Sequence, residues 1–427
     1  MKVHRAEGVE MEKMARKVLF IVIAALVLSS MAEASMVPDR RKNQFAADYG
    51  YALFPYPYSL PGIGTGLGLV GGASNIAGTH TDAYGMAFGG DITGLALGVA
   101  DVHVIPKTLI LDTGLSAISS ATIQSYSSRG MDTNENDYTN IELADMFYYG
   151  SRLTATFADR RFEFYGAYYQ GSSQLKSIRD QDGNVIVETQ SATSRGHVTL
   201  LGTRMDLTDD YADPRRGMRL DIGRSLTPPQ DSGPDFYIQD MSFTGYIPLG
   251  RRSTWAFNYF RSDAHVNRQG ETDPAVLAVK YNCDLLAVGS EERQFCDNVV
   301  KNEVLSNTYG TASSLGGFSR LRSYSSSRYK GAHTRFYGTE IRWNLTDEAT
   351  PYDIFIMKDI RTAWQIALYY EIGSTADLRS EVGDIWRSST GIGLRMVTAS
   401  GVVFRADVAI GREGVSPNIF IGYPWEL

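Results

Sequence analysis

Residues that could carry catalytic or metal chemistry are few in this sequence and lack partners at a useful spacing. The six histidines form no HExxH or paired-histidine pattern, and no recognisable partner spacing surrounds His80, His103, His197, His265 or His333. The sequence also contains no GxSxG motif, which would present a nucleophilic serine on a strand-to-helix turn. We therefore expect no enzyme, no metal site and no cofactor.

The pair Cys283 and Cys296 has a more specific chemistry. In an exported protein, two cysteines this close in the sequence usually form a disulfide bond. Metal binding by two lone cysteines is the weaker alternative.

Residues 1–34 have the pattern of an export signal. Arg16 and Lys17 precede an apolar stretch over 18–28, and the small-x-small pattern of 32–34 provides a cleavage site. A retained membrane anchor is the alternative, but the apolar stretch is shorter than the roughly 20 residues that a spanning helix needs. We expect the mature chain to begin near Ser35.

The composition favours a membrane barrel. Beyond the N-terminus no apolar run approaches the length of a membrane helix. A barrel hides its apolar surface from a hydropathy scan, because lipid-facing and lumen-facing residues alternate. The 41 basic residues are outnumbered by 48 acidic ones, so a nucleic-acid binder, which needs clustered positive charge, is not expected.

Three segments near the C-terminus, 337–345, 364–372 and 402–410, alternate between apolar and polar residues. The faces opposite the apolar residues carry charges: Glu340, Arg342, Glu371, Arg405 and Asp407. A soluble β-sandwich could show the same alternation with inside and outside exchanged. Trp and Tyr near strand ends, together with charges on faces that would line a lumen, favour the membrane barrel.

The chain is expected to divide into the signal 1–34, a periplasmic linker 35–61 rich in Pro and aromatic residues, and a barrel over 62–427. The strand pattern gives about fifteen strands, and bacterial single-chain barrels have even numbers. We predict an all-β fold, a transmembrane antiparallel β-barrel of sixteen strands, with an unrecognised turn between 107 and 128 supplying the missing strand.

The first and last predicted strands are both unusual. The first carries Gly62, Gly64, Gly66 and Gly68 on one face, which leaves room for close approach inside the barrel. The last alternates to the C-terminus and contains Pro424, which cannot donate a ladder hydrogen bond. These features predict a weak seam between the two strands; the alternative is that they only adjust curvature.

The segment 267–330 breaks the strand pattern. It contains both cysteines and a helical stretch over 273–304. Loops of this length are usually functional or disordered, and a disulfide favours an ordered one.

Within this segment, Leu315-Gly316-Gly317 and then Leu321-Arg322-Ser323-Tyr324 resemble a motif of the bacterial surface-antigen superfamily of outer-membrane barrels. That superfamily includes assembly factors of the BamA and TamA type. Their sixth extracellular loop folds back into the lumen and carries an Arg-Gly-aromatic tip after a Leu-Gly-Gly segment. Here Ser323 stands where Gly is usual. The resemblance implies that 267–330 is an extracellular loop inserted in the lumen.

Further motifs occur in the order of that family. The segment Asp213-Pro214-Arg215-Arg216-Gly217 resembles the turn before the ninth strand, and Glu371-Ile372-Gly373 resembles part of the thirteenth. Gly391 to Arg395 and Gly401 to Arg405 resemble the fourteenth and fifteenth strands. Family members with assembly activity carry periplasmic docking (POTRA) domains before the barrel, whereas here only the short linker is expected.

The resemblance also implies a lock between loop and lumen. Family acids at positions matching Glu340 and Glu371 hold the loop arginine, so Arg322 is expected to pair with one or both, beside Tyr324 at the loop tip. A buried, unpaired guanidinium loses its hydration, and a guanidinium can bridge two carboxylates. The alternative is that all three charges are solvated lumen residues.

Two functions are compatible with these patterns. The first is assistance in inserting or translocating proteins at the bacterial outer membrane, with incoming strands pairing at the weak seam. Its expected partners are outer-membrane lipid, client outer-membrane proteins and a separate periplasmic docking protein. The second is a plugged pore or a structural, surface-exposed barrel without assembly activity, which the missing docking domains favour.

Overall fold

The computed structural model describes residues 49–427, apart from 189–192, 212, 228–232, 347–351, 355, 361, 399–402 and 426–427. The expected signal segment 1–34 and residues 35–48 of the expected linker lie outside the described residues.

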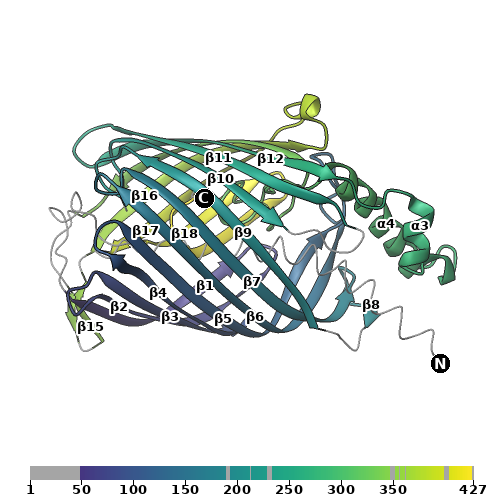
Figure 1. Cartoon of the computed structure of the whole chain (residues 1–427), viewed down its shortest axis with the longest axis horizontal. Helices are drawn as coiled ribbons and strands as arrows, with labels where there is room; N and C mark the ends of the chain where they lie inside the picture. The colour runs from purple at the N-terminus through teal and green to yellow at the C-terminus, as the bar shows by residue number, and fades with distance from the viewer. Residues whose placement is uncertain are drawn as a thin grey trace.

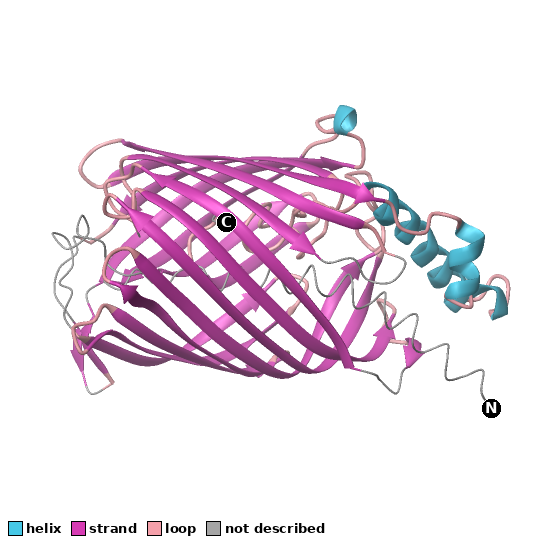
Figure 2. Ribbon diagram, in the orientation of Figure 1, coloured by secondary structure: helices cyan, strands magenta, loops and turns pink. Residues whose placement is uncertain are grey.

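Within these described residues, nineteen strands form one sheet whose paired neighbours are all antiparallel (Figures 1 and 2). They are β1 Gly50–Leu60, β2 Gly64–Ile76, β3 Thr81–Gly90, β4 Thr93–Ile105, β5 Leu109–Tyr126, β6 Tyr138–Phe157, β7 Phe162–Arg179, β8 Val185–Glu188, β9 Thr193–Asp206, β10 Gly217–Thr227, β11 Asp235–Pro248, β12 Ser253–Arg268, β13 His333–Asn344, β14 Tyr352–Ile354, β15 Met357–Ile360, β16 Thr362–Ala376, β17 Arg387–Thr398, β18 Val403–Gly411 and β19 Gly414–Ile421.

Sixteen of these strands close the barrel, because β8, β14 and β15 are short additions outside the main order. Each barrel strand pairs with the next along the chain, β7 with β9 and β13 with β16 included, and β19 meets β1. The predicted number of strands is confirmed. The predicted position of the missing strand is wrong: 107–128 holds a single long strand, β5, and the additional strand is β1, inside the expected linker.

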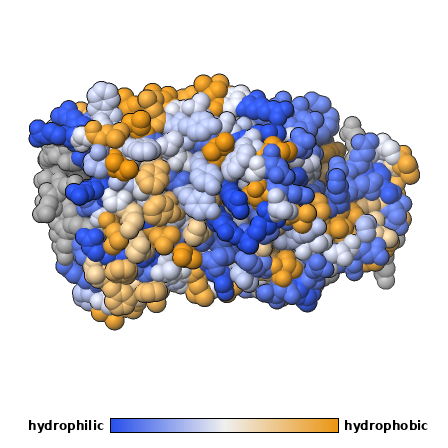
Figure 3. Space-filling model, turned by 90° about the horizontal axis from the view of Figure 1, so that it is seen from above, coloured by the Kyte–Doolittle hydropathy of each residue, from blue (hydrophilic) through white to orange (hydrophobic). Residues whose placement is uncertain are grey.

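Apolar side chains of the strands face outward and polar side chains face inward, as expected of a barrel in lipid. In β16, Leu368 and Tyr370 are exposed on the exterior, whereas Gln365 and Glu371 are buried in the interior. On the face seen in Figure 3, apolar residues gather mainly toward the left, and hydrophilic residues predominate toward the helices at the right. Among the described residues, no helix combines the length and apolarity needed to cross a membrane.

The two ends of the barrel differ in their connections. At the short-turn end lie turns such as 77–80, 106–108 and 158–161. At the long-loop end, residues 269–332 connect β12 to β13, close to the predicted bounds of 267–330. This loop carries two helices, α3 Pro274–Lys280 and α4 Glu291–Tyr309, which lie beyond the barrel rim in Figure 1.

The disulfide between Cys283 and Cys296 is present, as predicted. Cys296 lies in α4 and Cys283 in a single 3₁₀ turn, Cys283–Leu285, that follows α3. Both sulfurs are buried in the small apolar cluster between the helices. The bond therefore ties the helical part of the loop into one unit, which confirms the ordered loop that the cysteines indicated.

The glycine-rich strand β2 is not the edge strand that the sequence suggested. It pairs along one side with β1 and along the other with β3, while Gly62 lies in the turn that precedes it. The room left by its glycines is filled by β1: Tyr58 lies opposite Gly66, and a Cβ at Gly66 would meet the Tyr58 hydroxyl at 2.4 Å. Gly66 thus accommodates a tyrosine side chain of the neighbouring strand.

This packing predicts that Gly66→Ala destabilises the barrel. The new Cβ would lie 2.1 Å from the carbonyl oxygen of Gly89, and relieving such overpacking costs about 1–3 kcal/mol. Gly166→Ala is the matched control, because a Cβ at Gly166 in β7 meets only a leucine methyl at 3.6 Å. Heat-dependent gel mobility of the two variants in detergent tests the prediction, and equal melting of the two would contradict it.

Candidate functional site

The long loop returns into the barrel after α4. Its backbone is held at the rim by the hydrogen bond from the Ala312 amide to the Gly331 carbonyl, and deeper in the lumen by mutual bonds between Leu315 and Tyr329. The side chains of Leu315 and Tyr329 are fully buried, at 0% and 1% exposed. Residues 312–331 therefore form an inserted lobe that fills part of the lumen, as the resemblance implied.

Gly316 and Gly317 shape the inserted lobe. Both have positive φ values, 106° and 101°, which side chains rarely adopt. A Cβ at Gly316 would also lie 2.2 Å from the carbonyl oxygen of Ser325, on the returning segment of the lobe. The Gly-Gly pair is thus required by backbone geometry at this narrow point.

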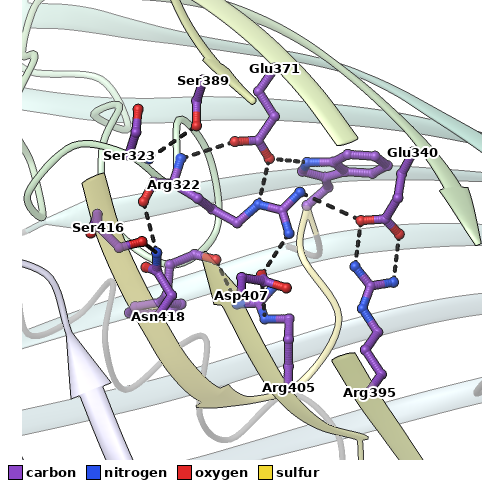
Figure 4. Close-up of polar contacts among 12 residues, drawn as sticks. Arg322, Ser323, Glu340, Glu371, Ser389, Arg395, Arg405, Asp407, Ser416 and Asn418 are labelled. Carbon is purple, nitrogen blue, oxygen red and sulfur yellow. Dashed lines mark hydrogen bonds and ion pairs between the residues drawn. The ribbon is translucent and has the colours of Figure 1, made fainter. Parts of the chain in front are cut away.

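Arg322, at the tip of the lobe, contacts three carboxylates from three barrel strands (Figure 4). Its Nε donates to Oε1 of Glu371 at 2.9 Å, its Nη1 donates to Oδ2 of Asp407 at 2.7 Å, and its Nη2 lies 3.5 Å from Oε2 of Glu340. The guanidinium also lies 3.3 Å from the ring centre of Tyr369. The predicted pairing with Glu340 and Glu371 is present, and Asp407 is a third partner.

Further arginines surround these carboxylates. Arg395 binds both oxygens of Glu340, and Arg342 donates to the same carboxylate at 2.7 Å. Arg405 lies 3.4 Å from Asp407 and donates to the carbonyl oxygen of Phe318 in the lobe at 2.6 Å. We call this set the lock: Arg322, Glu340, Arg342, Glu371, Arg395, Arg405 and Asp407.

The lock is fully buried, so its charges depend on each other. Arg322, Glu340 and Glu371 have side chains that are 0% exposed. Burial alone would lower the pKa of Arg322, but the carboxylates of Glu371 and Asp407 raise it above its ordinary value. Removing one partner of such a network leaves the others as uncompensated buried charges, at a cost of about 3–5 kcal/mol.

Ser323 and Tyr324 complete the tip without contacting the carboxylates of the lock. The positive φ of the tip is at Leu321, at 53°, and Ser323 is not among the residues with positive φ. This explains how serine fits where the family usually has glycine. The Tyr324 hydroxyl donates to the carbonyl oxygen of Ser388 at 3.1 Å, so Tyr324 fastens the tip to the start of β17.

The described segment after β19, residues 422–425, enters the lumen instead of continuing the last strand. β19 ends at Ile421, and the Gly422 amide donates to the carbonyl oxygen of Val403. Pro424 therefore lies in the turn after the strand and not in the seam, which corrects the sequence prediction. Trp425 is 1% exposed, and its indole nitrogen donates to Oε1 of Glu371 at 2.9 Å.

The predicted turn before β10 meets this C-terminal segment. Asp213 is buried and accepts a hydrogen bond of 2.5 Å from the hydroxyl of Tyr423. Pro214 follows in the turn, and Gly217 opens β10 with φ of 111°, where a Cβ would lie 2.3 Å from the carbonyl oxygen of Leu207. The turn motif thus positions a carboxylate that anchors the tail.

The seam between β1 and β19 is almost unpaired. Within the described residues the two strands share one pair, Ser59 with Ile419, supported by the Ser59 hydroxyl donating to the carbonyl oxygen of Pro417 at 2.9 Å. Pro55 and Pro57 lie opposite residues of β2 but have no amide hydrogen to donate to it. Because the backbone groups of alternate residues point to opposite edges of a strand, the nitrogens of both prolines face the seam. The missing donors of these two prolines thus account for the weakness of the seam.

Side chains replace part of the missing backbone pairing. The rings of Phe54 and Tyr56, from the inner face of β1, lie 4.9 Å and 5.4 Å from the ring of Phe404, on the outer face of β18. The Tyr56 hydroxyl also approaches the carbonyl oxygen of Arg405 at 3.4 Å. Strand β1 therefore overlaps the outside of the last strands, and apolar contact holds this overlap together.

Sequence reasoning identified Arg322, Glu340 and Glu371 but missed four members of the lock and Trp425. Asp407, Arg405 and Arg342 were already assigned to lumen faces by alternation, which was the available signal. Alternation does not give the height of a residue along the lumen, so it could not bring them together. For Trp425, the preceding proline was a signal that the strand ends early.

Arg322→Ala is predicted to lower the heat resistance of the folded barrel markedly, by about 3–5 kcal/mol if the carboxylates stay buried and unpaired. Arg322→Lys should recover only part of this loss, because an ammonium group cannot reach three carboxylates with planar geometry. Arg293→Ala, in the same loop but partly exposed beside Asp297, is the control and should cost about 1–2 kcal/mol, because it loses only this ion pair and one hydrogen bond to the Cys283 carbonyl. A gel-mobility melt in which Arg322→Ala equals Arg293→Ala would exclude a lock.

Comparison with protein-family models and with curated proteins gives no match. Among solved structures, BamA from Haemophilus ducreyi lacking POTRA domains 1–3 aligns with a TM-score of 0.45 and 12% identity, over 88% of this chain and 69% of that one. CdiB from Escherichia coli aligns with a TM-score of 0.49 and 12% identity, over 87% and 61%. Wzi, a carbohydrate-binding outer-membrane barrel from Escherichia coli, aligns at 0.32 and 10%, over 91% and 87%.

The chain thus spans 61% of the length of CdiB from Escherichia coli. BamA and CdiB are structural neighbours of the chain. At these TM-scores the superpositions add nothing to the barrel itself, which the pairing of its strands establishes.

Proposed function

We propose that this chain is a bacterial outer-membrane barrel, exported by residues 1–34, that assists the insertion or translocation of proteins through its first/last-strand seam. The observation that carries the proposal is the single residue pair between β1 and β19. A barrel with ordinary edges would close through a continuous ladder, since an unpaired backbone in lipid is costly. The role requires no catalytic residue.

The prolines of the seam support this role. Pro55 and Pro57 on β1 and Pro417 on β19 withhold three donors from the two strand edges that meet at the seam. Opening the seam therefore breaks few backbone hydrogen bonds, and a client strand can use the carbonyl groups and the remaining donors of β1. Such β-augmentation supplies affinity through the main chain and is tolerant of client sequence.

The lock supplies the rigidity that an opening seam needs. Arg322 ties the inserted lobe to β13, β16 and β18, and Asn418 of β19 donates to the Arg322 carbonyl at 2.8 Å. The C-terminal half of the barrel is thus cross-braced from inside up to its last strand. In the proposed mechanism β1 moves, and this braced half stays in place.

Docking of clients is assigned to a separate periplasmic protein. The described chain enters β1 at Gly50, so such a protein would meet the barrel at the short-turn end, where β1 begins. Client proteins and outer-membrane lipid are the remaining proposed partners, because the exposed exterior of strands such as β2 is apolar, with Leu67 at 60% exposed.

Bridging the seam is predicted to abolish assembly activity. In the variant with Ser59→Cys and Ile419→Cys, the two residues of the single seam pair are linked by oxidation or a short thiol-reactive bridge; Cys283 and Cys296 are already bonded to each other. Folding of a small outer-membrane barrel into liposomes that contain the purified chain should fall to the rate of empty liposomes and recover on reduction.

The matched control places the same bridge across a continuous ladder, with Leu200→Cys and Ser225→Cys between β9 and β10. This bridge should leave the activity unchanged. Native-level activity with the seam bridged would eliminate the proposed route.

A plugged barrel without assembly activity is the second candidate, and the filled lumen favours it. The inserted lobe, the C-terminal segment and the lock together bury side chains as large as Trp425, Arg322 and Arg328 inside the barrel.

Planar bilayers test this candidate. The native chain is predicted to conduct little, and removal of residues 311–331 should open stable conductance, because the lobe fills the lumen. Large steady conductance of the native chain would contradict a plug, whereas closed native barrels with unchanged client folding in liposomes would favour the second candidate over the first.

A further inference from the structure

Strand β1 has a second partner at the short-turn end, beyond the place where β19 stops. Tyr51 pairs with Lys358 and Ala52 with Met357, both in β15, and the Leu53 amide donates to the carbonyl oxygen of Ile356 at 3.0 Å. β15 belongs to a short hairpin with β14, in the connection between β13 and β16. The edge of β1 is therefore bound by a hairpin that three strands, β16, β17 and β18, separate from β19 in the sheet.

The inward course of the C-terminal segment leaves this edge vacant. The pair Ser59 with Ile419 places Ile421, the last residue of β19, beside Pro57, because partners in an antiparallel ladder run in opposite directions. From Gly422 the chain turns into the lumen, where Trp425 is held by Glu371. Half of β1 consequently has no partner from β19.

The bound backbone of β15 has the direction and register of an added strand. It is antiparallel to β1. Ile356, in the turn just before β15, accepts from the Leu53 amide and extends the same register by one residue. Ile356 and Lys358 are exposed, so the contact is made through the main chain. An extended segment of almost any sequence could make the same bonds.

We propose that β15 is a resident, displaceable strand that occupies the client-binding edge of β1 and competes with incoming extended segments. This inference rests on the proposed function. It adds a regulatory element: the edge over Tyr51 to Leu53 is covered in the resting chain and becomes available when β15 leaves. The competing ligand is an extended polypeptide strand, antiparallel to β1, that offers a carbonyl group at the position of Ile356.

The resting contact is tested by a disulfide between Ala52→Cys and Met357→Cys, which face each other across the ladder. Oxidation of the full chain in detergent should link them readily in barrels that retain folded gel mobility. The control pairs Ala52→Cys with Lys107→Cys, at an exposed turn of the same barrel end. Linking that is no more efficient than in the control would overturn the proposal.

Displacement is tested with a labelled synthetic peptide of this chain's own residues 352–360 as the probe. The backbone of Ile356 bonds to β1, and Lys358, two residues later, faces the same way. Lys358→Pro therefore removes an amide that faces β1 and leaves β1 itself native. The probe should bind this variant about tenfold more tightly than the native chain, because fewer hydrogen bonds between β15 and β1 must be broken before the probe can pair. The oxidised Ala52→Cys, Met357→Cys variant should not bind it until reduced.

Equal binding of the probe to native, Lys358→Pro and oxidised chains would overturn the inference. This outcome is separate from failure of the proposed function, because the probe measures access to β1 and not client folding. A chain that binds the probe as predicted but folds no client would contradict the assembly role alone. A chain that folds clients equally well with β15 bridged to β1 would contradict the competition alone.

Discussion

The burial of Arg322 is the constraint on which the rest of the structure depends. A guanidinium at 0% exposure must be surrounded by acceptors, and here they come from β13, β16 and β18. Because the three strands meet the lobe at one point, the lobe's path, the height of each strand and the interior of the barrel are set together. The excess of arginines around the carboxylates makes the cluster a braced joint between loop and wall.

The strands fastened by the lock and the strands at the seam differ in how firmly they are held. On one side, β13 to β18 are paired along their length and fastened through the lumen. On the other, β1 overlaps β18 and β19 through aromatic contacts and one residue pair. Stabilising contacts are thus concentrated away from the edge of β1 where a partner would pair. The proposed opening of the seam and the proposed displacement of β15 both depend on this difference.

Much of the fold could be predicted from alternation alone, since outward apolar and inward polar residues recur in β13, β16 and β18 as expected. Strand β1 was missed because Pro55 and Pro57 look like a linker, and only the register shows that their nitrogens face an open edge. Arg322 and its acids followed from a resemblance. Asp407 and Trp425 did not, because the tilt of the strands and the course of the tail decide which side chains meet.

Trp425 has a consequence for the order in which the molecule is built. Its ring packs in the same apolar cluster as Leu315, Leu321 and Tyr324 of the lobe, and a Cβ at Gly338 would collide with it at 2.6 Å. Since one oxygen of Glu371 serves both Arg322 and Trp425, the hydrogen bonds of this centre are complete only when the inserted lobe and the segment after β19 both lie in the lumen. Completion of the interior therefore couples these two segments, and a chain shortened before Trp425 would leave the apolar cluster of the lobe without its tryptophan.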